Sequence, residues 1–191
     1  MKKVILISGK GRHGKDSTAE ALRRRYEEEG KHVLIYHFAD PLKMICENAY
    51  HWTRGDKGPV GRTILQHTGD IYRGNKSDCW VKIAKEFVLS CPEEVVIIPD
   101  CRYPNETNVA DKKEIITLCV NRPIENDLTE EQRKHSSENA MNDNDFDFYI
   151  ENGSDNSTGY AIIQFFGQGW EVCDIESNNA LTGYTTKELI L

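Results

Sequence analysis

The sequence predicts a three-layer α/β fold, in which helices cover both faces of a mostly parallel, five-stranded sheet. Five short apolar runs supply the expected strands: Val4–Ile7, Val33–Phe38, Val95–Ile98, Ile115–Val120 and Phe146–Ile150. Runs such as VVII and IITLCV are continuous and do not alternate, which is typical of parallel strands covered on both faces. Helical patterns lie between the runs, and this succession favours βαβ units and a doubly wound sheet.

Three helices have recognisable ends. The first is predicted in KDSTAEALRRRYEEEG, where Gly30 would stop it. The pair Asp40–Pro41 predicts the second, with Asp40 as N-cap and Pro41 in the first turn. The pair Ser77–Asp78 begins the third, which should break at Cys91–Pro92. These helices are the expected covering layers of the sheet.

A single domain, residues 1–191, is expected, because no linker rich in Pro, Gly or Ser divides the chain. Two stretches, residues 53–61 and about 121–145, are polar and weakly patterned. Loops of that length in a compact domain are usually functional, so we expect a lid at about 121–145. The extension at about 167–191 is expected either to add an edge strand or to wrap the surface.

Composition narrows the function classes. The net charge is -7, from 24 basic and 31 acidic residues, which argues against a nucleic-acid-binding surface. No apolar run approaches the roughly 20 residues that span a bilayer, and the opening MKKVILISG is too short for a signal peptide and is interpreted as a strand. Six cysteines without a CxxC pair indicate reduced thiols. A cytoplasmic protein is therefore expected.

A phosphate-binding loop follows the first strand. The pattern Gly9-x4-Gly14-Lys15 stands between an apolar run and a helix, which is the context that this motif requires. Glycines let successive backbone N–H groups point at one anion, and the helix dipole adds positive potential there. Lys15 supplies a full charge for the β- and γ-phosphates. The sequence thus predicts the P-loop NTPase fold, with ATP held by Gly9, Lys10, Gly11, Arg12, His13, Gly14, Lys15, Asp16, Ser17 and Thr18.

The loop departs from the common motif directly after its lysine. Asp16 stands where a Ser or Thr usually binds Mg²⁺, and Ser17 and Thr18 follow. Asp16 could bind Mg²⁺ through water or orient an acceptor, or it could merely favour the helix N-terminus electrostatically. We expect Asp16 and Ser17 to contribute to a magnesium site.

A second constellation lies in VVIIPDCRYPNE. Asp100 comes just past the end of a buried strand, at the sheet edge where open α/β folds bind ligands. Asp100 is a candidate Mg²⁺ ligand, Arg102 can face the same cleft, and Glu106 could fix the orientation of Arg102. The alternative is an N-capping aspartate with a surface arginine.

Taken together, the motifs resemble the bacteriophage-type deoxynucleoside monophosphate kinases and, more distantly, the phosphomevalonate kinases of P-loop fold. The matching pieces, in order over roughly residues 3–155, are LISGKGRHGKDSTAEAL, HFADPLK, LQHTGDIYR, DCWV, VVIIPDCRYPNE, VNRP, HSSEN and FYIENGS. The resemblance implies transfer of the γ-phosphoryl group of ATP to a (deoxy)nucleoside monophosphate, with Mg²⁺, in the cytoplasm (the host cytoplasm for a viral protein).

The resemblance also implies roles for single residues. The catalytic residues would be Lys15, Asp16, Asp100, Arg102 and Arg122. The acceptor-binding region, about 40–92, would contribute Asp40, Lys43, Arg73 and Trp80, joined by Arg102, His135 and Glu138. Asn152 and Gly153 would lie near the adenine.

Physical chemistry supports the arginines most directly, because guanidinium pairs with phosphate in a bidentate way. Some of the other residues have a structural role as the alternative: core packing for Trp80, and helix capping for Asp40 and for the segment around His135. The polar stretch 121–145 fits a lid that excludes water from the transferred group.

Several alternatives stay open from the sequence. The acceptor could be a non-nucleotide phosphate, or the protein could bind nucleotide without transferring phosphate. Neither the preferred base nor the sugar follows from the residues. The C-terminal stretch could pair across a homodimer or stay with its own subunit.

Overall fold

The computed structural model describes residues 2–54, 58–122, 128–141, 146–152, 160–165 and 169–174. From residue 151 onward, only the course of the backbone is described. Its strands are β1 (Lys3–Ser8), β2 (Val33–Ile35), β3 (Val95–Ile98), β4 (Ile115–Asn121), β5 (Phe148–Asn152), β6 (Tyr160–Phe165) and β7 (Gly169–Asp174). Its helices are α1 (Lys15–Glu28), α2 (Ala39–Tyr50), α3 (Pro59–Asn75), α4 (Cys79–Ser90), α5 (Glu130–Lys134) and α6 (Ser136–Asn139), with 3₁₀ turns at Pro104–Asn108 and Lys112–Glu114.

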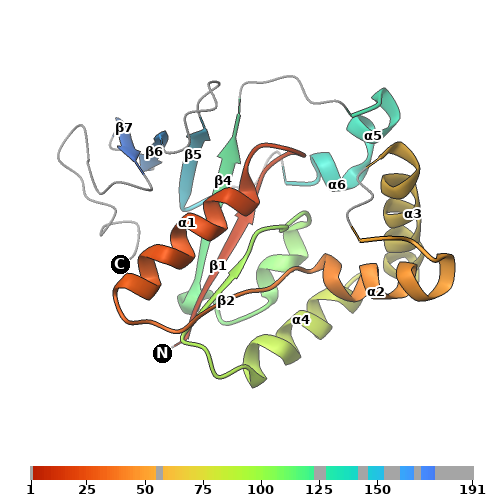
Figure 1. Cartoon of the computed structure of the whole chain (residues 1–191), viewed down its shortest axis with the longest axis horizontal. Helices are drawn as coiled ribbons and strands as arrows, with labels where there is room; N and C mark the ends of the chain where they lie inside the picture. Colours follow the sequence, from red (N-terminus) through yellow and green to blue (C-terminus); the bar gives the residue numbers. More distant parts are fainter. Residues whose placement is uncertain are drawn as a thin grey trace.

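One sheet carries the whole architecture, in the strand order β2-β3-β1-β4-β5-β6-β7. The first five strands in that order pair in parallel, which confirms the predicted five-stranded parallel sheet. The strands β6 and β7 extend the sheet by antiparallel pairing. They lie at the edge opposite to α2, α3, α5 and α6 (Figure 1). Part of the C-terminal extension, β7, therefore adds an edge strand.

Alternate residues of the central strands point into two separate cores. On one face, Ile5 and Ile7 of β1 pack with Leu22 and Tyr26 of α1. On the other, Val4 and Leu6 join a second cluster that includes residues of α4. Both faces are buried, as continuous apolar strands require. The three layers are therefore present, with β1 between β3 and β4 at the centre.

The second helix is capped differently from the prediction. Asp40 was expected as its N-cap, but the N-cap is Phe38, and Asp40 lies within the first turn. The carboxylate of Asp100 takes over the capping: its oxygens accept hydrogen bonds from the N–H groups of Phe38 (2.9 Å) and Ala39 (3.0 Å). The strand β2 ends at Ile35, before the predicted Phe38, which instead stands at the N-cap of α2.

Other ends agree more closely. Gly30, with φ 77°, follows the end of α1, and Asp78 is the N-cap of α4, which ends before Cys91. The sequence missed α3, which begins at Pro59 inside the supposed loop 53–61. Among the described residues, no helix combines the length and apolarity that a membrane crossing requires.

Candidate functional site

Backbone conformation shapes the phosphate loop between β1 and α1. Gly9 and Gly14 have φ values of 139° and 92°, in the region where side chains are strained. A Cβ on Gly9 would also collide with the carbonyl oxygen of Val120 on the neighbouring strand. Arg12 has φ 66° and tightens the turn. Gly9 is therefore required by both strain and close packing, and the loop delivers the chain into α1 at Lys15.

Lys15 lies folded into this loop. Its Nζ donates to the carbonyl oxygens of Gly9 (2.8 Å) and Lys10 (2.7 Å), and the residue is 8% exposed. Burial, reinforced by the nearby Arg102 guanidinium, lowers the pKa of Lys15 to about 7. A phosphate anion would compensate the charge of the buried ammonium group, so the surroundings of Lys15 favour binding of an anion.

The predicted metal ligands occupy different surroundings. Asp16 lines a cavity beside the phosphate loop, is 77% exposed at its side chain, and has its Oδ1 3.3 Å from Nε2 of His37. Hydrogen bonding to Asp16 raises the pKa of His37. Ser17 is exposed and does not line the cavity, whereas both oxygens of Asp100 are engaged by α2 amides.

A cavity of about 540 Å³ opens directly beside the phosphate loop. Its wall combines the loop, the start of α2, one side of α3 and the turn after β3. Seven of its residues are lysine or arginine, against four acids: Arg12, Lys15, Lys43, Arg54, Arg62, Arg73 and Arg102, with Asp16, Asp100, Glu106 and Glu138. A chain of net charge -7 thus gathers positive charge in one pocket.

Glu106 organises two of these arginines. Its side chain is 2% exposed; Oε2 accepts from the backbone N–H groups of Arg102 (2.6 Å) and Tyr103 (3.0 Å), while Oε1 lies 3.3 Å from Nη2 of Arg73. Arg73 also stacks over the Tyr103 ring, with Cζ 3.9 Å from the ring centroid. Burial raises the pKa of Glu106 to about 6.

The floor of the cavity is apolar. Trp52 and Trp80 are both almost fully buried and belong to one cluster with Leu42 and Cys46, against which Leu65 packs. Trp80 lies 5.5 Å from Tyr72, between ring centroids. Trp80 therefore packs in a core, as the alternative role required, and it also lines the cavity; its contact with an acceptor stays a prediction. A cavity with an apolar floor and cationic walls suits a ligand that carries both a ring and a phosphate.

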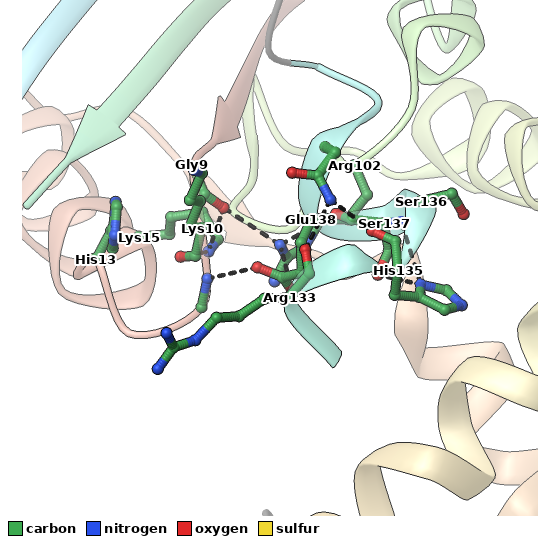
Figure 2. A network of polar contacts seen from close by, with 12 residues as sticks. Gly9, Lys10, His13, Lys15, Arg102, Arg133, His135, Ser136, Ser137 and Glu138 are labelled. Carbon is green, nitrogen blue, oxygen red and sulfur yellow. Dashed lines mark hydrogen bonds and ion pairs between the residues drawn. The ribbon is translucent and has the colours of Figure 1, made fainter. Parts of the chain in front are cut away.

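The predicted lid contributes one wall of the cavity. In its described part, Nε2 of His135 lies 2.8 Å from Oδ2 of Asp70 on α3, and Gln132 donates to the carbonyl oxygen of Pro59. Glu138 reaches the phosphate loop and Arg102, as Figure 2 shows. The segment 128–141 therefore bridges α3 and the phosphate loop. Residues 123–127 and 142–145 of the predicted lid lie outside the described residues.

The cavity brings together only some of the predicted site residues: Gly11, Arg12, Lys15, Asp16, Lys43, Arg73, Trp80, Asp100, Arg102, His135 and Glu138. Asp40 lies behind it, paired with Lys43 at 3.0 Å. His13 and Arg122 meet at the end of β4, where the Arg122 N–H lies 3.2 Å from Nδ1 of His13. Also outside the cavity wall are Gly9, Lys10, Gly14, Ser17 and Thr18. Asn152 ends β5, and Gly153 lies outside the described residues.

Sequence reasoning missed four polar members of the wall, namely His37, Arg54, Arg62 and Gln66. His37 directly precedes the FADPLK motif, and the two arginines lie in or next to the polar stretch 53–61. Basic residues in a weakly patterned segment were the available signal. The α3 helix, which carries Arg62 and Gln66 to the wall, was not predicted, so their direction could not be inferred.

The strand order, the phosphate loop and the helix that it begins define a P-loop NTPase fold. No protein-family model and no curated protein matches the sequence. An APS kinase of Mycobacterium tuberculosis, solved as a cysteine-to-alanine mutant, is 13% identical over 82% of this chain and 88% of that one, with a TM-score of 0.40. The complex of that kinase with AMPPNP and APS gives 12% identity over 64% of each chain and a TM-score of 0.37. Similarity this low does not identify a substrate.

Proposed function

We propose that this protein transfers the γ-phosphoryl group of ATP to a (deoxy)nucleoside monophosphate, giving the diphosphate and ADP. The observation that carries the proposal is the cavity that begins at Lys15 and holds seven lysine and arginine side chains in an acidic chain. Phosphoryl transfer needs positioning and positive charge far more than covalent help from the protein. A cavity of this charge beside a phosphate loop fits two phosphorylated ligands that meet end to end.

The donor side rests on the loop and Lys15. Loop amides and the α1 N-terminus would hold the β- and γ-phosphates, and Lys15 would leave the carbonyls of Gly9 and Lys10 to pair with them. No cluster of three potential metal ligands occurs among the described residues. Mg²⁺ is usually held by one or two carboxylates together with substrate phosphates, and the exposed Asp16 fits that arrangement. When bound, Mg²⁺ would neutralise charge that develops on the phosphates.

The acceptor side rests on the opposite wall. Arg73, whose guanidinium lies beside Glu106, and Arg102, whose backbone N–H donates to Glu106, would pair with the acceptor phosphate, and Lys43 lines the same cavity. The apolar floor of the cavity, which includes Trp80 and Leu65, would bind the nucleobase. An oxygen of the acceptor phosphate would then attack the γ-phosphorus. A new O–P bond forms as the bond from the γ-phosphorus to the bridging oxygen breaks, and ADP leaves with that electron pair.

Water must be kept from the γ-phosphorus, because water would compete with the acceptor. The segment 128–141, already in contact with the loop and α3, supports a lid that closes when both ligands are bound. Arg122 precedes that segment, and its Nε is buried without a hydrogen-bond partner among the described residues. We propose that Arg122 joins the phosphates on closure.

The test is ADP formation by the purified protein with ATP and Mg²⁺ against each common ribo- and deoxyribonucleoside monophosphate. Turnover that needs one or a few of these acceptors, and that is lost in Lys15→Ala, would support the proposal. Arg73→Gln should raise KM for the acceptor and leave KM for ATP within about twofold, because Arg73 lies on the acceptor wall. Turnover of a non-nucleotide phosphate alone, or ATP binding without any turnover, would contradict it.

A further inference from the structure

The carboxylate of Glu138 lies between two groups that are built to bind anions. Its Oε2 accepts from the N–H of Gly11 at 2.9 Å, and its Oε1 accepts from Nη1 of Arg102 at 2.9 Å. The Glu138 side chain is 7% exposed. Figure 2 shows it reaching from α6 into the space between the phosphate loop and Arg102. The carboxylate of Glu138 therefore takes the two hydrogen-bond donors, the Gly11 N–H and Nη1 of Arg102, that lie at the proposed site of phosphoryl transfer.

The surroundings of this carboxylate are strongly positive. A Cβ on Gly11 would lie 3.7 Å from Oε2 of Glu138 and 3.6 Å from Nη1 of Arg62, so a second guanidinium is close. The charge of Glu138 also acts on the buried Lys15. A backbone N–H of a phosphate loop and an arginine fork are groups that recognise phosphate oxygens. Two carboxylate oxygens satisfy them in the way that two phosphate oxygens would.

We propose that Gly11 and Arg102 form one phosphate subsite, and that Glu138 occupies it as a tethered competitor until a phosphate compound displaces its carboxylate. Two anions at this position would repel each other and compete for the Gly11 N–H and for Nη1 of Arg102. Displacement releases the shortest contact of Arg102 Nη1, which also lies 3.3 Å from the carbonyl oxygens of Gly9 and Ser137, and it breaks the contact of α6 with Gly11. The inference rests on the proposed function for its ligand class, although its test needs no turnover.

Occupation by Glu138 has a measurable consequence in the ligand-free protein. The affinity for phosphate compounds is lower, because the hydrogen bonds of Glu138 with Gly11 and Arg102 must break before such a compound binds. Occupation by Glu138 also holds the segment 128–141 against the phosphate loop when no nucleotide is present. Binding of the donor phosphates alone should therefore loosen this segment, and only the pair of ligands should close it again.

The experiment measures binding of inorganic pyrophosphate by calorimetry to the wild type, to Glu138→Gln and to Glu131→Gln. Glutamine keeps the shape of Glu138 but removes the charge, and charge-assisted hydrogen bonds are roughly twice as strong as neutral ones. We expect Glu138→Gln to bind pyrophosphate at least about fivefold more tightly than the wild type. Glu131 is exposed in α5 of the same segment, so Glu131→Gln controls for the change in net charge and should stay within about twofold.

Affinity of Glu138→Gln that is equal to or weaker than that of the wild type would overturn the proposal, as would a gain of the same size in Glu131→Gln. A second measurement uses the wild type alone, in case Glu138→Gln does not fold. Amide exchange across residues 128–141 should become faster when pyrophosphate binds, and slower or unchanged exchange would also overturn the proposal. Failure of the kinase assay with success here would refute the proposed reaction and leave the competition standing.

Discussion

Arg73 and Glu106 meet at the wall of the cavity, with Nη2 of Arg73 3.3 Å from Oε1 of Glu106 across 33 residues of sequence. The other carboxylate oxygen of Glu106 accepts from the backbone N–H groups of Arg102 and Tyr103. One buried carboxylate thus contacts the side chain of Arg73 and fixes the backbone at Arg102, the two arginines that we assign to the acceptor phosphate. Glu106 is a positioning residue, because it acts through these arginines.

Replacement Glu106→Gln should raise KM for the acceptor about tenfold or more, since losing a hydrogen bond to a charged group costs roughly 1.5 to 3 kcal/mol. KM for ATP should change less than KM for the acceptor, because Glu106 pairs with the side chain of Arg73 and contacts only the backbone of Arg102 and Tyr103. Steady-state kinetics with each substrate varied will separate the two constants. Glu86→Gln, on the exposed side of α4, is the matched control and should behave as the wild type. An equal loss in both KM values would contradict this role.

The same residue predicts a pH dependence of stability. Burial raises the pKa of Glu106 to about 6 in the folded protein, above the ordinary glutamate value of 4.5. The folded state therefore binds this proton more tightly than the unfolded state does. The Glu106 contribution is fully present below pH 4.5, and it is lost as pH rises through 6, by about 2 kcal/mol. Urea unfolding of the wild type and Glu106→Gln from pH 4.5 to 7 gives the free energy of unfolding at each pH. The free energy should fall more steeply with pH in the wild type, and parallel plots for the two proteins would refute this prediction.

Nucleotide binding should take up a proton at Lys15. In the ligand-free protein its pKa is lowered to about 7 by burial and by Arg102. Phosphate oxygens stabilise the ammonium form, so binding raises this pKa. Near pH 8, ATP binding should therefore absorb up to about one proton per site. Calorimetry in two buffers of different ionisation enthalpy measures this uptake, which should shrink near pH 6, and identical enthalpies at pH 8 would contradict it.

Gly9→Ala should destabilise the protein by several kcal/mol and abolish ATP binding. Its φ of 139° is strained for alanine, and the new methyl would meet the Val120 carbonyl. Thermal unfolding and calorimetry with ATP test both effects. Gly74→Ala is the matched control, because nothing lies within 4 Å of its Cβ in α3. That variant should be unchanged or stabilised by up to about 1 kcal/mol, and equal losses in the two variants would refute the argument.

The sequence predicted the parallel sheet and the phosphate loop because both follow from local patterns. Continuous apolar runs placed four of the five parallel strands within about two residues of their ends, and the loop motif was in its expected context. Lys15, Asp100 and Arg102, which the sequence placed at the ends of neighbouring strands, line one cavity. Their catalytic roles stay predictions.

What the sequence missed depends on contacts between distant residues. Asp100 caps α2 from the turn after β3, so Asp40 looked like the cap only because it lay nearby in sequence. The helix α3 begins inside a stretch with Gly and Pro that resembles a loop in the sequence. Because this helix was not predicted, the direction of Arg62 could not be inferred. The contact of Glu138 with Gly11 spans 127 residues, beyond any local pattern.

The most direct test of the account follows the phosphoryl group itself. The protein is mixed with ATP, Mg²⁺ and one nucleoside monophosphate, and ³¹P NMR identifies the molecule that gains phosphorus. We expect a nucleoside diphosphate signal that grows with ADP in equal amount, and no growth with Lys15→Ala. Release of inorganic phosphate in place of the diphosphate, or no consumption of ATP with any nucleoside monophosphate, would contradict it.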